Sequence, residues 1–304
     1  MEVILRSRKT RNGDKYKYST GQLFNFAANS YFDRTSRPVY ALVFLLPFII
    51  VYELGTLFIN TDILSQTQIR VVAFVWLQDF LEHLGFGERL AWAAPALAVV
   101  IILVALQIVS RKKWHFGFGD LPPMAVECIL LAMPLIMLSL VLNMNSSSAQ
   151  PGHTQDFNSP PAAVAYCAAA VPVNAANVAE KPGTLANIIT GIGAGIYEEL
   201  IFRLILICAL MVVFQDFLGL QQTRAVILSV LISAALFSAH HHIVFLNGQF
   251  DRSLPFNWTE FIFRTAAGVY FAFLFAIRGF GITAGTHAFY DIIATLINAT
   301  FFQV

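Results

Sequence analysis

Charged residues and cysteines are both scarce in this sequence. Only 12% of its 304 residues are Asp, Glu, Lys or Arg, while 57% are hydrophobic, against about 25% charged residues in a typical soluble domain. The formal net charge of +1 provides no overall positive charge for binding nucleic acid. The three cysteines, Cys128, Cys167 and Cys208, are too scattered for a disulfide framework or a zinc-binding spacing. These shortages exclude an ordinary soluble domain and a nucleic-acid-binding protein, and they favour a membrane protein with free thiols.

Long apolar runs fill most of the chain after residue 37. A helix needs about 20 apolar residues to cross a bilayer, and seven stretches reach or approach that length. Two others are ambiguous: Ile69–Phe86 contains Asp79, Glu82 and His83 and suits an interfacial helix, and Ala162–Ala179 is a candidate re-entrant piece. We therefore predict an all-α, polytopic transmembrane helical bundle with seven to eight spans. The seven are Pro38–Ile59, Leu90–Val109, Met124–Met144, Leu185–Phe214, Ala225–His241, Thr259–Ile277 and Ile282–Phe302.

Two basic segments predict the orientation in the membrane. Lysines and arginines are frequent in residues 1–37, and Arg111-Lys112-Lys113 follows the second predicted span. Positive loops stay on the cytoplasmic side, so both segments are expected there. We predict a basic cytoplasmic segment, residues 1–37, and a membrane-embedded domain, residues 38–304, with a catalytic core from about 185 to 304. The expected location is the cell or inner membrane, as an integral multi-pass protein in contact with the lipid bilayer.

Three ionisable side chains lie in the fourth predicted span. Glu198, Glu199 and Arg203 are the only charged residues between Leu185 and Phe214. A charge at membrane depth costs at least about 2.5–3.5 kcal/mol and usually faces a functional cavity. Glu199 and Arg203 are four residues apart and can form an ion pair, whereas Glu198 lies about 100° around the helix. The spacing therefore predicts that Arg203 neutralises Glu199 and that Glu198 is a second carboxylate at membrane depth, not paired with this arginine.

Later spans carry two more polar clusters. The fifth span ends at His240-His241-His242, and the seventh contains His287 and Asp291, four residues apart. Each cluster has a structural alternative: an ion network between helices for the glutamates, an interfacial anchor for the three histidines, and a helix-to-helix hydrogen bond for His287 and Asp291. Taken together, a carboxylate and imidazoles on three spans are the groups needed to activate water and stabilise an oxyanion.

These motifs, in this order, resemble those of the CAAX-protease and bacteriocin-processing family of intramembrane endopeptidases, to which the type II CAAX prenyl endopeptidases belong. That family carries EExxxR, then FxxxH, then HxxxN or HxxxD on successive core helices. Here the motifs are Glu198-Glu199 with Arg203, Phe237 with His241, and His287 with Asp291. The resemblance covers the chain from about Leu185 onward. The departures are Asp291, where asparagine is more usual, and the additional His240 and His242.

The resemblance implies a role for each motif residue. Glu198 would be the general base that takes a proton from water, and Glu199 would pair with Arg203. His241 would position the water or pass its proton to the leaving amine. His287 and Asp291 would form the oxyanion side. Because consecutive helical residues point about 100° apart, we expect His241 alone of the three histidines to face Glu198, with His240 and His242 dispensable.

Several alternatives stay open. Glu198, His241 and His287 have the composition of a His₂Glu zinc site, but the sequence contains no HExxH, so we predict a metal-free site with zinc as the alternative. A proton-coupled transporter would predict an inverted repeat, and none is visible. A non-catalytic scaffold or immunity protein of the same fold would keep the same residues. The expected partner is a peptide or protein substrate at the membrane, such as a prenylated CAAX tail, a bacteriocin leader or a regulatory membrane protein.

Overall fold

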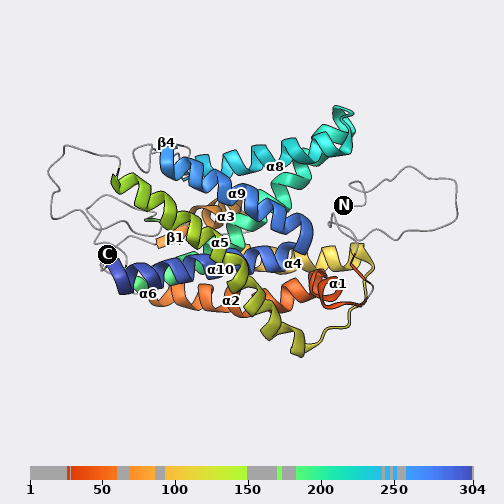
Figure 1. Cartoon of the computed structure of the whole chain (residues 1–304). Coiled ribbons are helices and arrows are strands. Elements are labelled where there is room, and N and C mark those ends of the chain that lie inside the picture. The colour runs from red at the N-terminus through yellow and green to blue at the C-terminus, as the bar shows by residue number, and fades with distance from the viewer. Residues whose placement is uncertain are drawn as a thin grey trace.

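The computed structural model describes residues 26–27, 29–59, 69–85, 93–148, 170–172, 183–241, 244–246, 249–251 and 258–302. Helices dominate these segments (Figure 1). The α-helices are α1 (Tyr31–Thr35), α2 (Pro38–Ile59), α3 (Val72–His83), α4 (Ala94–Ser110), α5 (Leu121–Ser148), α6 (Thr184–Glu199), α7 (Ile207–Val212), α8 (Gln222–Ala239), α9 (Trp258–Arg278) and α10 (Phe280–Ile297). A 3₁₀ turn η2 (Phe118–Asp120) precedes α5, and π-helical segments η3 (Leu200–Leu206), η4 (Val213–Phe217) and η5 (Asn298–Phe302) extend or join the later helices.

Short strands form two small antiparallel pairs within the described segments. β1 (Ile69–Val71) pairs with β2 (Ala170–Pro172), and β3 (Val244–Leu246) pairs with β4 (Gln249–Asp251). Apart from β2, the candidate re-entrant piece Ala162–Ala179 lies outside the described residues. These pairs of three-residue strands leave the helical architecture unchanged.

The helices confirm the predicted polytopic bundle of an integral multi-pass membrane protein. In the described part of the chain, six helices are long and apolar enough to cross a membrane. α4 is also apolar but has 17 residues, and it occupies the predicted second span. The remaining six predicted spans coincide with these long helices, and the fourth is one continuous helix from Thr184 to Phe217. α3 has 12 residues, too few to cross the bilayer.

α10 is the central helix of the bundle. Within its membrane-spanning window 72% of the residues are buried, against 28–39% in the other long helices. It packs against α6, α5, α2 and α9, and Figure 1 shows α6 and α2 running alongside it. The lipid-facing sides of the outer helices leave their apolar residues exposed, as expected for a protein whose solvent is lipid. The core therefore lies around α10, the helix that carries His287 and Asp291.

Glycines allow α6 to approach α10 closely. A Cβ added to Gly195 would lie 2.5 Å from the backbone nitrogen of Ala288, and one added to Gly191 would lie 2.6 Å from the Cβ of Asp291. Gly191 and Gly195 form the small-xxx-small spacing that lets membrane helices pack backbone to backbone. The pairing also shows that the two helices are antiparallel. It brings the end of α6, with Glu198 and Glu199, against the middle of α10.

Candidate active site

The glutamate pair lies where α6 changes into a π-helix. α6 ends at Glu199 and η3 begins at Leu200, and π-helical turns are frequent at functional sites. Glu198, Glu199 and Arg203 are all 0% exposed. Arg203 Nε lies 3.0 Å from Glu199 Oε2, which is the ion pair that their spacing predicts. The two glutamates therefore differ in environment, because the ion pair with Arg203 is formed by Glu199.

Arg203 has other partners besides Glu199. Its guanidinium carbon lies 4.2 Å from the centre of the Phe237 ring and 5.6 Å from that of Phe271. Its Nη2 donates a hydrogen bond of 3.3 Å to the carbonyl oxygen of Gly268. A guanidinium stacks well on aromatic faces when it is removed from water. Arg203 thus joins η3 to α8 and α9 and holds Glu199 in place.

His287 reaches the glutamates from α10. Its Nδ1 lies 2.7 Å from Glu199 Oε1, and its ring stacks on Phe271 with centroids 4.5 Å apart. Because an ionised carboxylate only accepts hydrogen bonds, Nδ1 carries the proton. Nε2 then faces two other carboxylates, at 3.5 Å from Asp291 Oδ2 and 4.0 Å from Glu198 Oε2. The contact between His287 and Glu199 joins residues 88 positions apart, and the sequence motifs gave no sign of it.

His240 and His241 both reach the site. Their Nδ1 atoms lie 2.5 and 2.8 Å from the same carbonyl oxygen, that of Phe237. A carbonyl oxygen only accepts, so both Nδ1 atoms carry protons and both Nε2 atoms are acceptors in the neutral rings. His240 Nε2 lies 3.6 Å from Glu198 Oε1.

The expectation that His241 alone faces Glu198 is therefore wrong in its geometry. α8 ends at Ala239, and the spacing of 100° per residue does not hold beyond a helix end. The centroids of the His240 and His241 rings lie 3.9 Å apart, and both rings lie on the side of Glu198. His242 lies outside the described residues.

The donor atoms suit a metal ion, although in a different set from the one that the sequence suggests. Among the described residues, ligand atoms of Glu198, His240 and His241 lie within 4.8 Å of one another, and all three residues are buried. Zinc bonds of about 2.0–2.1 Å place two tetrahedral ligands roughly 3.4 Å apart, close to the 3.6 Å between Glu198 and His240. The sequence suggested Glu198, His241 and His287 as zinc ligands, whereas the structure groups Glu198 and His241 with His240.

Aromatic rings enclose the polar cluster. Phe237 packs edge-on against His241 and His287, and Phe202 lies 4.8 Å from His240 between ring centroids. Trp76, on α3, lies edge-on to His240 at 5.8 Å. Such walls exclude water and strengthen the electrostatic interactions inside. The sequence motif pairs Phe237 with His241, but no motif marks Trp76 and Phe271, which only the tertiary fold brings to the site.

A comparison with known families bears on this cluster. Residues 181–293 match the family model described as type II CAAX prenyl endopeptidase Rce1-like. The matched segment contains Glu198, Glu199, Arg203, His241, His287 and Asp291. No curated protein and no solved structure matches the chain. The match therefore confirms, for residues 181–293, the resemblance that the three motifs indicate.

Proposed function

We propose that the protein is an intramembrane endopeptidase that hydrolyses a peptide bond of a membrane-associated protein with a water molecule activated by Glu198. One observation carries this proposal. Glu198 is fully buried and faces the imidazoles of His240 and His287, whereas the adjacent Glu199 forms an ion pair with Arg203. A buried carboxylate beside imidazoles is the combination that general-base catalysis needs.

Glu198 would take a proton from water as the water oxygen attacks the carbonyl carbon. The carbon–nitrogen bond then breaks, and the proton passes to the departing amine. His241 would position the water or carry that proton, because its ring is held by the Phe237 carbonyl with Nε2 as an acceptor. His240 lies beside it and shares the contact with Glu198.

His287 and Asp291 would stabilise the oxyanion of the tetrahedral intermediate. The buried cluster contains three carboxylates, Glu198, Glu199 and Asp291, and one guanidinium. If all were ionised and the histidines neutral, the cluster would hold an uncompensated negative charge, which is expensive away from water. A protonated His287 reduces that charge and turns Nε2 into a donor. One preorganised oxyanion donor is worth about 2.7–4 kcal/mol.

A metal ion would fit this site, and Glu198, His240 and His241 would hold it. When bound, zinc polarises a water molecule as a Lewis acid. We nevertheless propose a metal-free reaction, because Glu198 as a ligand would leave the base role to a different group, and Glu199 already pairs with Arg203.

The expected result is activity that survives prolonged dialysis against a strong chelator, with no stoichiometric zinc by elemental analysis. One zinc per chain, with a reversible loss of activity on chelation and a loss of zinc in His240→Ala, would instead establish the metal site.

The proposed function is tested by Glu198→Gln in purified protein in liposomes with a peptide library. The amide has nearly the same shape but cannot accept the proton, so hydrolysis should fall at least about 100-fold, within the 10²–10⁴-fold range of general-base catalysis. Glu260→Gln is the matched control, because Glu260 is a half-exposed carboxylate paired with Arg264 on the same chain. Thermal unfolding in detergent should be the same for both variants. Residual activity above about 10% would remove Glu198 as the base, and binding of peptides without any cleavage by wild type would favour the scaffold alternative.

A further inference from the structure

His240 contacts Glu198 although it lies outside the FxxxH motif, which pairs Phe237 with His241. Its Nε2 lies 3.6 Å from Glu198 Oε1, and the two side chains are 3% and 0% exposed. Because Nδ1 of His240 donates to the Phe237 carbonyl, Nε2 of the neutral ring is an acceptor. An ionised carboxylate is also only an acceptor. Two acceptors therefore face each other in a buried site, and a donor between them would satisfy both.

One water molecule is the donor that fits this contact. Polar groups more than about 3.5 Å apart are often bridged by water, and a water about 2.8 Å from each atom fits between two acceptors that are 3.6 Å apart. It would donate one hydrogen to Glu198 and the other to His240, whose buried Nε2 has no hydrogen-bond partner among the described residues. With both hydrogens engaged, the lone pairs of the water point away from the two acceptors and are free to attack.

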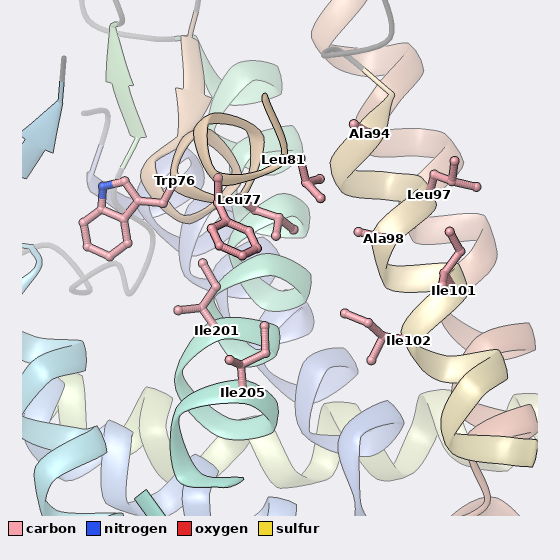
Figure 2. Close-up of a pocket in the computed structure, with 11 residues that line it drawn as sticks. Trp76, Leu77, Leu81, Ala94, Leu97, Ala98, Ile101, Ile102, Ile201 and Ile205 are labelled. Atoms are coloured by element: carbon pink, nitrogen blue, oxygen red, sulfur yellow. The ribbon is translucent and has the colours of Figure 1, made fainter. Parts of the chain in front are cut away.

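Aromatic rings hold the His240 imidazole in this orientation. Phe202 and Trp76 lie 4.8 and 5.8 Å from it between ring centroids. Trp76 comes from α3 and also lines a groove between α3, α4 and η3, whose lining residues are all apolar or aromatic (Figure 2). The imidazole thus has a hydrocarbon environment on the Trp76 side and the Phe237 carbonyl at Nδ1. Nε2 is the atom that it offers to the polar cluster.

The two oxygens of Glu198 face two different imidazoles. Oε1 lies 3.6 Å from His240 Nε2, and Oε2 lies 4.0 Å from His287 Nε2. His287 is the group proposed above as the donor to the oxyanion. The attacking water and the oxyanion would therefore lie at different oxygens of one carboxylate, with an accepting imidazole beside the water and a donating imidazole beside the oxyanion.

We propose that His240 Nε2 and Glu198 Oε1 together hold the water molecule that attacks the peptide bond. The inference rests on the proposed function and adds a catalytic residue that the sequence motifs do not include. In the reaction the water oxygen bonds to the carbonyl carbon, the O–H bond that faces Glu198 breaks, and its proton moves to Oε1. The other hydrogen stays on the oxygen and keeps its hydrogen bond to His240. His241 is then left to carry the proton from Glu198 to the departing amine.

The kinetic test uses protein dialysed against a strong chelator, in liposomes, with a peptide that the wild type cleaves. His240→Phe keeps an aromatic ring but has no Nε2. Its kcat should fall at least about tenfold with KM within about twofold, because losses from a misplaced reactant reach about 100-fold. His83→Phe is the matched control, because His83 is an exposed histidine at the end of α3, and it should leave kcat unchanged. Both variants should keep the wild-type unfolding midpoint in detergent.

Chemical rescue separates the acceptor nitrogen from the packing of the ring. His240→Gly leaves a space for imidazole or pyrrole, two rings of the same size. Both carry an N–H for the Phe237 carbonyl, but only imidazole has a second, accepting nitrogen. Imidazole should restore kcat of His240→Gly and pyrrole should not. Equal rescue by the two rings, full activity in His240→Phe, or a wild-type protein that needs added zinc after dialysis would overturn the inference.

Solid-state NMR of protein labelled with nitrogen-15 histidine tests the water contact without turnover. The His240 signal is assigned by its loss in His240→Phe. Its Nε2 should carry no proton of its own and should receive magnetisation from water. A missing transfer would overturn the inference whatever the activity. A transfer from water to Nε2 in a wild-type protein that cleaves no peptide would refute the proposed function alone and leave the water site in place.

Discussion

Glu198 and Glu199 are neighbours in the chain but have different electrostatic surroundings. Glu199 lies between Arg203 and His287, at 3.0 and 2.7 Å, so its charge is balanced on both sides. Glu198 faces the imidazole Nε2 atoms of His240 and His287, at 3.6 and 4.0 Å. A single step along the chain thus separates the carboxylate that pairs with Arg203 from the one that we propose as the base.

Asp291 is the residue where this chain departs from the commoner asparagine. Its Oδ2 lies 3.5 Å from His287 Nε2, so its negative charge would favour the protonated ring that we propose as the oxyanion donor. We expect Asp291→Asn to remain active, because the amide keeps the size and can donate a hydrogen bond itself. Asp291→Ala should lose at least about tenfold in kcat, the low end of what an oxyanion-side group contributes. Steady-state kinetics of both variants with matched unfolding midpoints provides the check. Full activity in Asp291→Ala would remove Asp291 from the site.

For single residues, the sequence predicts contacts within one helix better than contacts between helices. The pairs Glu199–Arg203 and His287–Asp291 follow from spacings of four residues, and both are present. The contact of His287 with Glu199 depends on how α6 and α10 meet. The position of His240 depends on where α8 ends, and hydrophobic periodicity does not mark a helix end to one residue.

Among the elements, the contact between α6 and α10 decides whether the site forms. Gly195 touches the backbone of Ala288, one residue after His287. A backbone contact cannot move aside as a flexible side chain can, so the distance between the helices is fixed by the missing Cβ. The helices themselves were predictable, because apolar runs and helix lengths coincide closely, as in α2. Their relative depth and rotation were not, since these depend on glycine contacts across the bundle.

Gly195→Ala should therefore destabilise the protein and impair the site together. The new Cβ would lie 2.5 Å from the Ala288 nitrogen, and overpacking of this kind typically costs about 1–3 kcal/mol. We expect a lower unfolding midpoint in detergent and reduced hydrolysis. Gly183→Ala is the control, because a Cβ there would meet no atom within 4 Å and its backbone has φ −63°. A Gly195→Ala protein with the wild-type midpoint and activity would contradict the role given to this contact.

The whole molecule has one basic end, to which several distant segments contribute. Arg34 in α1 forms an ion pair of 2.8 Å with Asp120, in the segment between Arg111-Lys112-Lys113 and α5. Arg278, at the end of α9, donates to Glu127 and to the hydroxyls of Thr35 and Ser36. α10 therefore starts at this end, and His287 lies two turns, about 10 Å, further in. The candidate site is at membrane depth but nearer the basic end, because a bilayer core is about 30 Å thick.

By the positive-inside rule we expect this end to face the cytoplasm. α6 begins at the opposite end, because it runs antiparallel to α10. In a background with Cys128, Cys167 and Cys208 replaced by serine or alanine, Gly119→Cys marks the exposed turn at the basic end and Leu185→Cys marks the exposed start of α6. A membrane-impermeant maleimide applied to intact cells should label the Leu185 variant and should label the Gly119 variant only after the membrane is opened. The reverse pattern would invert the orientation and place the site nearer the outer surface. Labelling of both variants in intact cells would show that residues 119 and 185 lie on one side, which the antiparallel packing of α6 and α10 does not allow.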